Sequence, residues 1–102
     1  MRGAMPENPN DLLDLVKDEA TFLAFVEALR LDRIEEKERE HVSPSSPLGP
    51  GANGWQNQTI EQFLGAAVSW AEDTDVGLTQ GLDPTKPWKR FAVFLYCGKI
   101  YE

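Results

Sequence analysis

The chain has 102 residues, 41% of them hydrophobic and 26% charged, with a net charge of −7 at pH 7. These values, together with ten aromatic residues, are typical of one globular domain and argue against wholesale disorder. An acidic protein repels phosphate backbones, so we expect no nucleic-acid binding. The single cysteine, Cys97, excludes an intrachain disulfide, and no apolar run has the length of a signal peptide or a membrane span. We therefore expect a cytoplasmic protein that does not associate with membranes.

The first part of the chain predicts a tail followed by two helical segments. Residues 1–10 are punctuated by proline and asparagine and predict a flexible N-terminal tail, with residues 11–102 forming one helical domain. Residues 11–16 predict a short helix or turn. Asp18 is suited to cap a long helix from about residue 19 to residue 40. Four apolar side chains of this helix fall on one face at helical spacing: Phe22, Phe25, Val26 and Leu29.

The second half of this helix has the sequence DRIEEKEREH and is almost entirely polar. Glu35 and Arg39 are placed to form an i,i+4 ion pair. Acids also face each other at this spacing, because Asp32, Glu36 and Glu40 are four residues apart. We therefore expect a solvated arm that frays and projects past the core.

Residues 42–58 predict a loop within the domain, because three prolines and three glycines lie between residues 42 and 54. Thr59 then opens the clearest helix, which runs to about residue 73. Thr59 and Gln62 have the spacing of a capping box, in which each side chain satisfies the other's free backbone N–H. The apolar residues of this helix fall on one side of the helical wheel: Ile60, Phe63, Leu64, Ala67, Val68, Trp70 and Ala71.

Residues 74–86 predict a second loop, and the segment 88–97 that follows is apolar on nearly every side. Pro87 suits the first turn of a helix and Gly98 suits its end. We therefore expect a central helix here, with a strand over residues 91–96 as the alternative because FAVFLY is also β-prone. The predicted fold is all-α, a compact bundle of three main helices plus a short N-terminal helix.

The sequence offers no recognisable catalytic or metal-binding machinery. Cys97 lies in an apolar run, and the only histidine, His41, lies on the charged arm, so no thiolate–base pair is indicated. Glu38 and His41 could share a helix face, but one histidine with scattered carboxylates rarely binds zinc. No nucleophile-elbow or phosphate-loop motif occurs. We therefore expect a protein that is not an enzyme and that has no catalytic residue, metal or cofactor.

Four residues are the candidates for a binding site: Trp55, Asn57, Trp70 and Leu78. Trp55 and Asn57 follow the proline-rich loop, where they either hold the loop on the core and cap a helix or form a ligand patch. Leu78 lies in a loop flanked by glycines, where it either tucks inward or presents a contact surface. The pattern alone leaves both alternatives open for each residue.

Three stretches together resemble a family of small bacterial proteins that is known as a domain of unknown function. They are the segment from Gly54 to Leu64 (GWQNQTIEQFL), the segment Trp70–Asp73 (WAED), and the C-terminal part from Pro87, which ends in GKIYE. Phe22, Phe25 and Leu29 fit the opening helix of that family. The resemblance implies a bacterial single-domain protein and supplies no catalytic residue.

The composition favours a non-enzymatic binding or regulatory module that acts through a protein partner. The net charge and the absence of lysine and arginine from residues 55–83 favour a basic partner, as for immunity proteins or antitoxins. The alternative function is a small-molecule pocket near Trp55 and Trp70, covered by the loop 42–54. The protein is expected to be a monomer or a homodimer, and a dimer follows if segment 88–97 is not central.

Overall fold

The computed structural model describes residues 8–46 and 49–101. The described chain contains no strand and forms α1 (Pro9–Leu13), α2 (Glu19–Val42), α3 (Ile60–Thr74), a 3-10 turn η1 (Leu78–Gln80) and α4 (Pro87–Ile100). The all-α prediction of three main helices plus a short N-terminal helix is therefore confirmed, and residues 91–96 are helical. Residues 1–7 of the expected tail lie outside the described residues. Pro9 and Asn10 belong to α1 rather than to a tail, because the Asn8 side chain accepts a hydrogen bond from Asn10 N and caps this helix.

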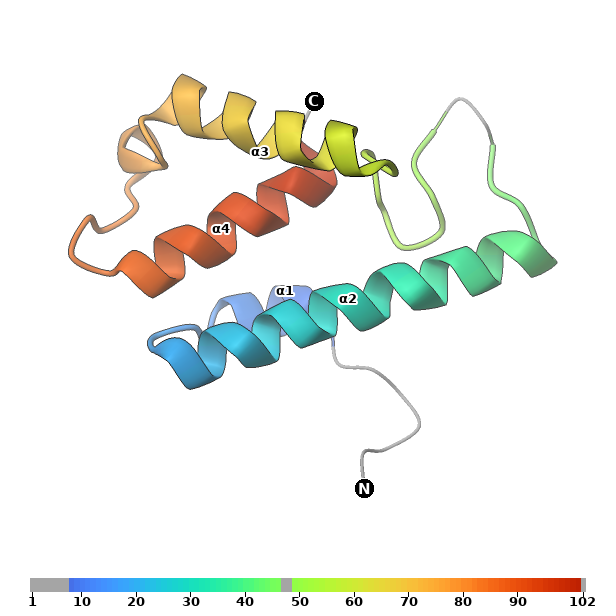
Figure 1. Ribbon diagram of the computed structural model, residues 1–102, viewed down its shortest axis with the longest axis horizontal. Coiled ribbons are helices and arrows are strands. Elements are labelled where there is room, and N and C mark those ends of the chain that lie inside the picture. The colour runs from blue at the N-terminus through green and yellow to red at the C-terminus, as the bar shows by residue number, and fades with distance from the viewer. Residues whose placement is uncertain (1–7, 47–48, 102) are drawn as a thin grey trace.

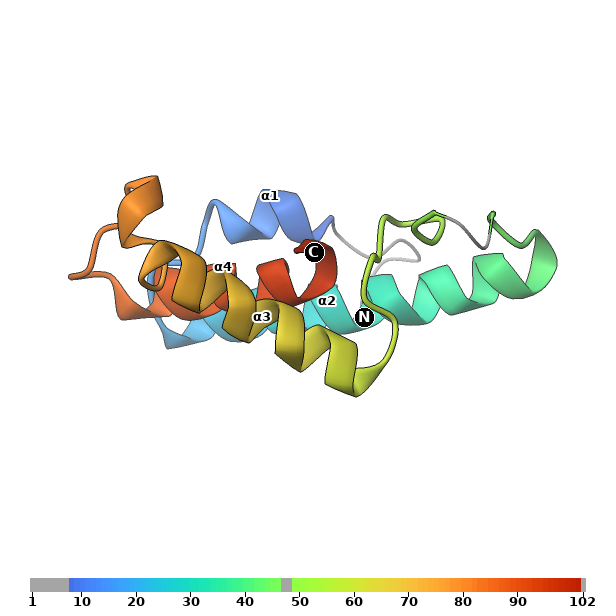
Figure 2. The same ribbon diagram turned by 90° about the horizontal axis from the view of Figure 1, so that it is seen from above.

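Helix α4 occupies the middle of the molecule. Figure 1 shows α3 on one side of α4 and the α1–α2 pair on the other, and Figure 2, seen from above, shows α3 in front of α4 and α2. Both α2 and α3 pack on α4, but in the described chain they do not pack on each other. Two helices that share a neighbour without touching leave a furrow between them.

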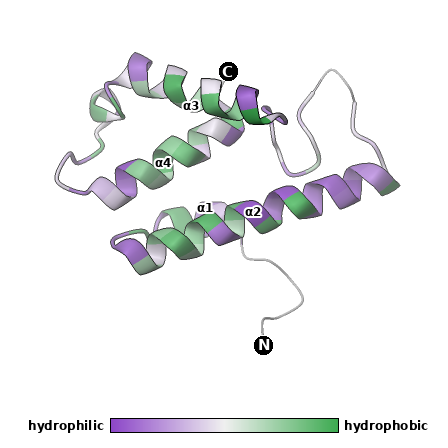
Figure 3. Cartoon of the chain, viewed as in Figure 1, coloured by the Kyte–Doolittle hydropathy of each residue, from purple (hydrophilic) through white to green (hydrophobic). Residues whose placement is uncertain are grey.

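The core lies where α2 and α4 meet the connection between α1 and α2 and the end of the loop between α2 and α3. Its buried apolar residues are Val16, Phe25, Leu29, Trp55 and Ala92, and Leu12 and Leu13 of α1 pack against them partly buried. The half of α2 that extends past α4 is hydrophilic, as Figure 3 shows, and the loop between α2 and α3 lies beside it. The polar half of α2 and this loop form a second, smaller layer of structure.

Two helix starts follow the predicted capping, one of them with a different partner. Asp18 accepts a hydrogen bond from Thr21 N at 2.9 Å, and the Thr21 hydroxyl accepts one in return from Asp18 N. Thr59 Oγ1 accepts from Gln62 N at 3.1 Å as predicted. The Gln62 side chain, however, accepts from Gln58 N at 3.2 Å rather than completing the box at Thr59.

Gly98 does not end α4, which continues to Ile100, so this detail of the prediction is wrong. The residue is buried against the Phe63 ring of α3, and a Cβ atom placed on it would lie 2.8 Å from that ring. Its missing side chain therefore serves the close approach of α3 to α4 rather than a turn of the chain.

Candidate functional site

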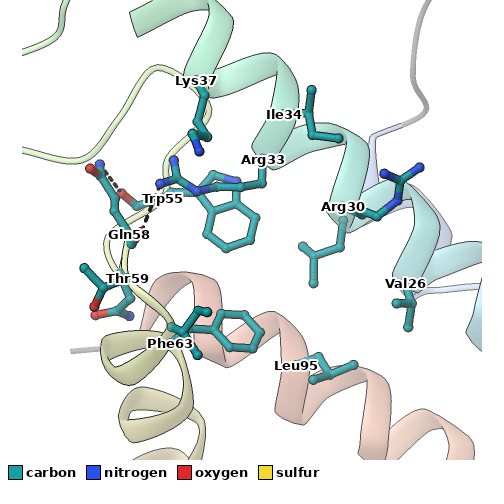
Figure 4. Close-up of a pocket in the computed structure, with 13 residues that line it drawn as sticks. Val26, Arg30, Arg33, Ile34, Lys37, Trp55, Gln58, Thr59, Phe63 and Leu95 are labelled. Carbon is teal, nitrogen blue, oxygen red and sulfur yellow. Dashed lines mark hydrogen bonds between the residues drawn. The ribbon is translucent and has the colours of Figure 1, made fainter.

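An apolar groove of about 610 Å³ lies between α2 and the start of α3, with one residue of α4 in its floor. We call it the α2–α3 groove; Figure 4 shows it with the side chains that line it. The apolar lining comes from α2, the loop, α3 and α4: Val26, Leu29, Trp55, Ile60, Phe63 and Leu95. The groove exists because α2 and α3 both pack on α4 but not on each other.

Trp55 lines the groove and is held by contacts with α2, α3 and α4. Its ring stacks on Phe63 with 6.1 Å between centroids, and its indole Nε1 donates to Asp32 Oδ2 at 2.9 Å. Two cations lie over the same ring, with Arg33 Cζ at 5.6 Å and Lys99 Nζ at 5.5 Å from its centroid. These contacts therefore hold Trp55 in place without a ligand, and its ring forms one wall of the groove.

Three carboxylates of α2, Asp32, Glu36 and Glu40, bind the loop that follows the helix; we call them the carboxylate ladder. Glu36 is fully buried, and its Oε1 accepts hydrogen bonds from the backbone N–H groups of Asn53 (2.8 Å) and Trp55 (3.3 Å). Glu40 accepts from the backbone N–H groups of residues 45 and 52. The ladder thus supplies the hydrogen-bond acceptors that a strand would supply in a sheet.

The expectation that residues 32–41 form a solvated, fraying arm is therefore wrong for the face that carries the ladder, while Lys37, Glu38 and His41 are exposed and the helix extends past α4 as expected. The N–H groups of the loop and two cations compensate the negative charges of the ladder. Lys99 Nζ lies 2.8 Å from Asp32 Oδ2, and Arg33 Nη1 lies 2.9 Å from Glu36 Oε2. Glu35 and Arg39, which were expected to pair with each other, both bind the Asn53 side chain. Backbone donors 12 to 19 residues away in the chain decide the structure of this segment.

Three cations of α2 line the groove: Arg30, Arg33 and Lys37. Figure 4 shows them on the same helix, with the Arg33 side chain beside the Trp55 ring. Arg30 forms a two-bond ion pair with Glu27 (2.9 and 2.8 Å), and Arg33 also donates to Gln58 O at 3.0 Å. Lys37 is exposed and has no hydrogen bond or ion pair with any residue that the structure describes. The apolar groove thus has a cationic side.

The exposed side of α3 extends the apolar surface away from the groove. Ile60 lines the groove and is 78% exposed, and Leu64 and Val68 follow on the same side of the helix with exposed fractions of 52% and 47%. We call these three residues the α3 stripe. The sequence placed them with Phe63, Ala67 and Trp70 on one predicted core face; the structure buries Ala67 and Trp70, partly buries Phe63, and leaves the stripe exposed.

The groove contains two of the four predicted site residues. Trp55 and Asn57 both line it, although the Asn57 side chain donates to Gly98 O (3.0 Å) and Tyr101 O (2.8 Å) and so caps the end of α4. Trp70 is buried elsewhere and donates from Nε1 to Gln80 Oε1 at 2.9 Å. Leu78 is 46% exposed on η1. The structure therefore does not bring Trp55 and Trp70 to one pocket.

The cations of the groove were not predicted as site residues. Arg30, Arg33 and Lys37 occur at i, i+3 and i+7 in a predicted helix, which is the spacing of one helix face. The signal was therefore present, but Arg33 and Lys37 were assigned to the charged arm and Arg30 was given no role. The position of this face opposite Phe63 and Ile60 depends on tertiary packing.

A second, polar hollow of about 440 Å³ lies beside the ladder, lined by Asp32, Glu35, Arg39, Asn53 and Lys99 among others. These five groups already bind one another, so the hollow leaves none of them unpaired.

Burial raises the pKa of the Cys97 thiol to about 11, which favours the unreactive protonated form. Among the residues that the structure describes, no group of three or more histidine, cysteine or acidic side chains could hold a metal ion.

These features define a small all-α domain with an open apolar groove and one cationic side. Residues 18–102 match a family of unknown function, DUF7660, and the chain belongs to this family. Comparison with curated proteins and with solved structures gave no significant match. No helix in the described parts of the chain is long and apolar enough to cross a membrane.

Proposed function

We propose that the protein is a non-enzymatic binding module that holds a protein partner in the α2–α3 groove and on the α3 stripe. The observation that carries this proposal is the exposure of Ile60, Leu64 and Val68 beside a groove whose floor is also apolar. Contiguous exposed apolar surface with a polar rim is typical of interaction sites in soluble proteins. A partner that covers it gains the free energy of removing these side chains from water.

A regulatory role, of the kind played by immunity proteins and antitoxins, is the form of this function that the composition supports. The net charge of −7 favours a partner that is basic overall. The charge at the groove itself is of the opposite sign, and at physiological salt charges more than about 8 Å apart are largely screened. The segment that enters the groove and the partner as a whole can therefore differ in charge.

Photo-crosslinking in cells of the source organism tests the proposal. Benzoylphenylalanine at Leu64 should give a covalent adduct with another protein, and the same probe at Leu78 should not, because Leu78 is similarly exposed but lies on η1. Adding Ile60→Glu should remove the adduct. No adduct, an adduct of equal yield from both positions, or an adduct only with a second copy of this chain would overturn the proposal.

A small apolar ligand in the same groove is the second candidate function. The volume of about 610 Å³ supports it, because small-molecule sites in proteins have volumes of about 300–1,000 Å³. A metabolite library screened by tryptophan fluorescence and melting temperature tests this candidate through Trp55. If no compound changes either signal, the groove is not a small-molecule site.

A further inference from the structure

We infer that the segment held in the α2–α3 groove is an amphipathic α-helix with acidic residues along one flank. This inference rests on the proposed function and names the chemistry of the partner. The apolar face of such a helix would contact the groove floor and the α3 stripe. Its acidic flank would lie along Arg30, Arg33 and Lys37, which line one side of the groove.

The walls of the groove favour a helix over an extended peptide. An extended peptide that adds to a protein surface through its backbone needs an exposed strand edge. The groove is walled by α2 and α3, whose interior backbone groups are already hydrogen-bonded within each helix, and the described chain contains no strand. A helix satisfies its own backbone and needs only side-chain contacts from the groove.

The spacing of the cations favours a row of acids over a single anionic group. Arg30 and Lys37 are seven residues apart on α2, which is about 10 Å along the helix axis, with Arg33 between them. One carboxylate, such as the head of a fatty acid, can meet only one end of this row. Acids at i, i+3 or i+4, and i+7 of a partner helix repeat at the same distances and can meet all three cations.

The cations keep donors for a partner. Arg30 uses Nε and Nη2 for Glu27, and Arg33 uses Nη1 and Nη2 for Glu36 and Gln58. A guanidinium carries five N–H groups, so N–H donors remain on both arginines. Lys37, exposed and unpaired within the described chain, contributes a positive charge to the same side of the groove.

Two synthetic 16-residue peptides with the same leucine seam test the inference, one with glutamate and one with lysine on the flank. The readout is the indole N–H signals in a ¹⁵N correlation spectrum, because Trp55 lines the groove and Trp70 is buried away from it. The glutamate peptide should shift the Trp55 signal and not the Trp70 signal. The lysine peptide should bind at least about tenfold more weakly at low salt.

Charge reversal on the protein gives the matched control. Lys37→Glu should weaken the glutamate peptide about tenfold and strengthen the lysine peptide. Lys17→Glu changes the net charge by the same amount at an exposed position outside the groove and should change neither affinity by more than about twofold. Both positions are exposed, so neither variant should unfold the domain.

The outcomes separate this inference from the proposed function. Equal binding of both peptides at Trp55 would overturn the acidic flank, and the proposed function would stand. If neither peptide shifts Trp55 while the Leu64 crosslink persists, the helical occupant is overturned and the binding surface stands. A shift of Trp55 by oleate or by a proline-rich peptide, with none by either helical peptide, would also overturn the inference.

Discussion

Removing the Glu36 carboxylate should cost this domain much of its stability. The side chain is fully buried and accepts from Arg33 Nη1 and from the backbone N–H groups of Asn53 and Trp55. Glu36→Ala leaves a guanidinium without its ion partner and two backbone donors without an acceptor. Loss of one member of a buried ion pair costs about 3–5 kcal/mol, and we expect a value in this range.

Urea unfolding followed by tryptophan fluorescence measures this change. A domain of this size is stable by about 5–15 kcal/mol, so the variant should remain foldable but lose a large part of its unfolding free energy. Glu36→Gln keeps one acceptor oxygen and should lose about 1–3 kcal/mol. Glu38→Ala, at an exposed position two residues along the same helix, should change stability by less than about 0.5 kcal/mol.

A loss of unfolding free energy below about 1 kcal/mol for Glu36→Ala, or equal losses for the variants at positions 36 and 38, would refute this account of Glu36.

Gly51→Ala tests the same site from the side of the loop. A Cβ atom at residue 51 would lie 2.3–2.5 Å from the Glu36 carboxylate group, which cannot move without breaking its hydrogen bonds. We expect a loss of about 1–3 kcal/mol, and Gly49→Ala, which meets nothing within 4 Å, is the control.

Two further predictions concern α3 and α4. Gly98→Ala should lower the unfolding free energy by about 1–3 kcal/mol because its Cβ would meet the Phe63 ring. Gly65→Ala, in open space within α3, should raise the unfolding free energy by about 0.5–1 kcal/mol. Urea unfolding measures both changes, and changes of the same sign for the two variants would contradict the packing argument. Since burial raises the pKa of Cys97 to about 11, the folded thiol should react with iodoacetamide at pH 8 at least about 100-fold more slowly than the unfolded thiol; equal rates in folded and urea-unfolded protein would contradict this. The stability that the protonated thiol contributes should be present below pH 9 and lost between pH 9 and 11, and a Cys97→Ala variant with the same alkaline loss would contradict this.

The local features of the fold could be predicted because they depend on neighbours in the chain. Asp18 and Thr59 cap helices through residues three positions away, and the apolar spacing of residues 88–97 indicated the central helix. The start of α4 at Pro87 follows from the fixed φ angle of proline in a first turn. Each of these signals is complete within a short stretch of sequence.

The groove and the carboxylate ladder could not be predicted in the same way. Glu36 repels its like-charged neighbours in an isolated helix, and besides the ion pair with Arg33 its burial needs the backbone N–H groups of Asn53 and Trp55, which lie far along the chain. Lys99 reaches Asp32 across 67 positions of the chain. The α3 stripe was assigned to the core because a helical wheel shows which residues share a side and not how wide a side the neighbouring helix covers.

The carboxylate ladder binds the loop through its main chain as well as through the side chains of Ser45, Asn53 and Trp55. Four of its hydrogen bonds go to backbone amides, at residues 45, 52, 53 and 55, and main-chain amides are the same whatever side chain a residue carries. Ala52 is exposed and could be replaced by most other amino acids without loss of that bond, except by proline, which has no amide hydrogen. Exposed positions such as Ala52 can therefore vary while one helix continues to dictate the path of the loop, and with it the position of Trp55, whereas Gly51 and Asn53 are fixed by their contacts with the same helix.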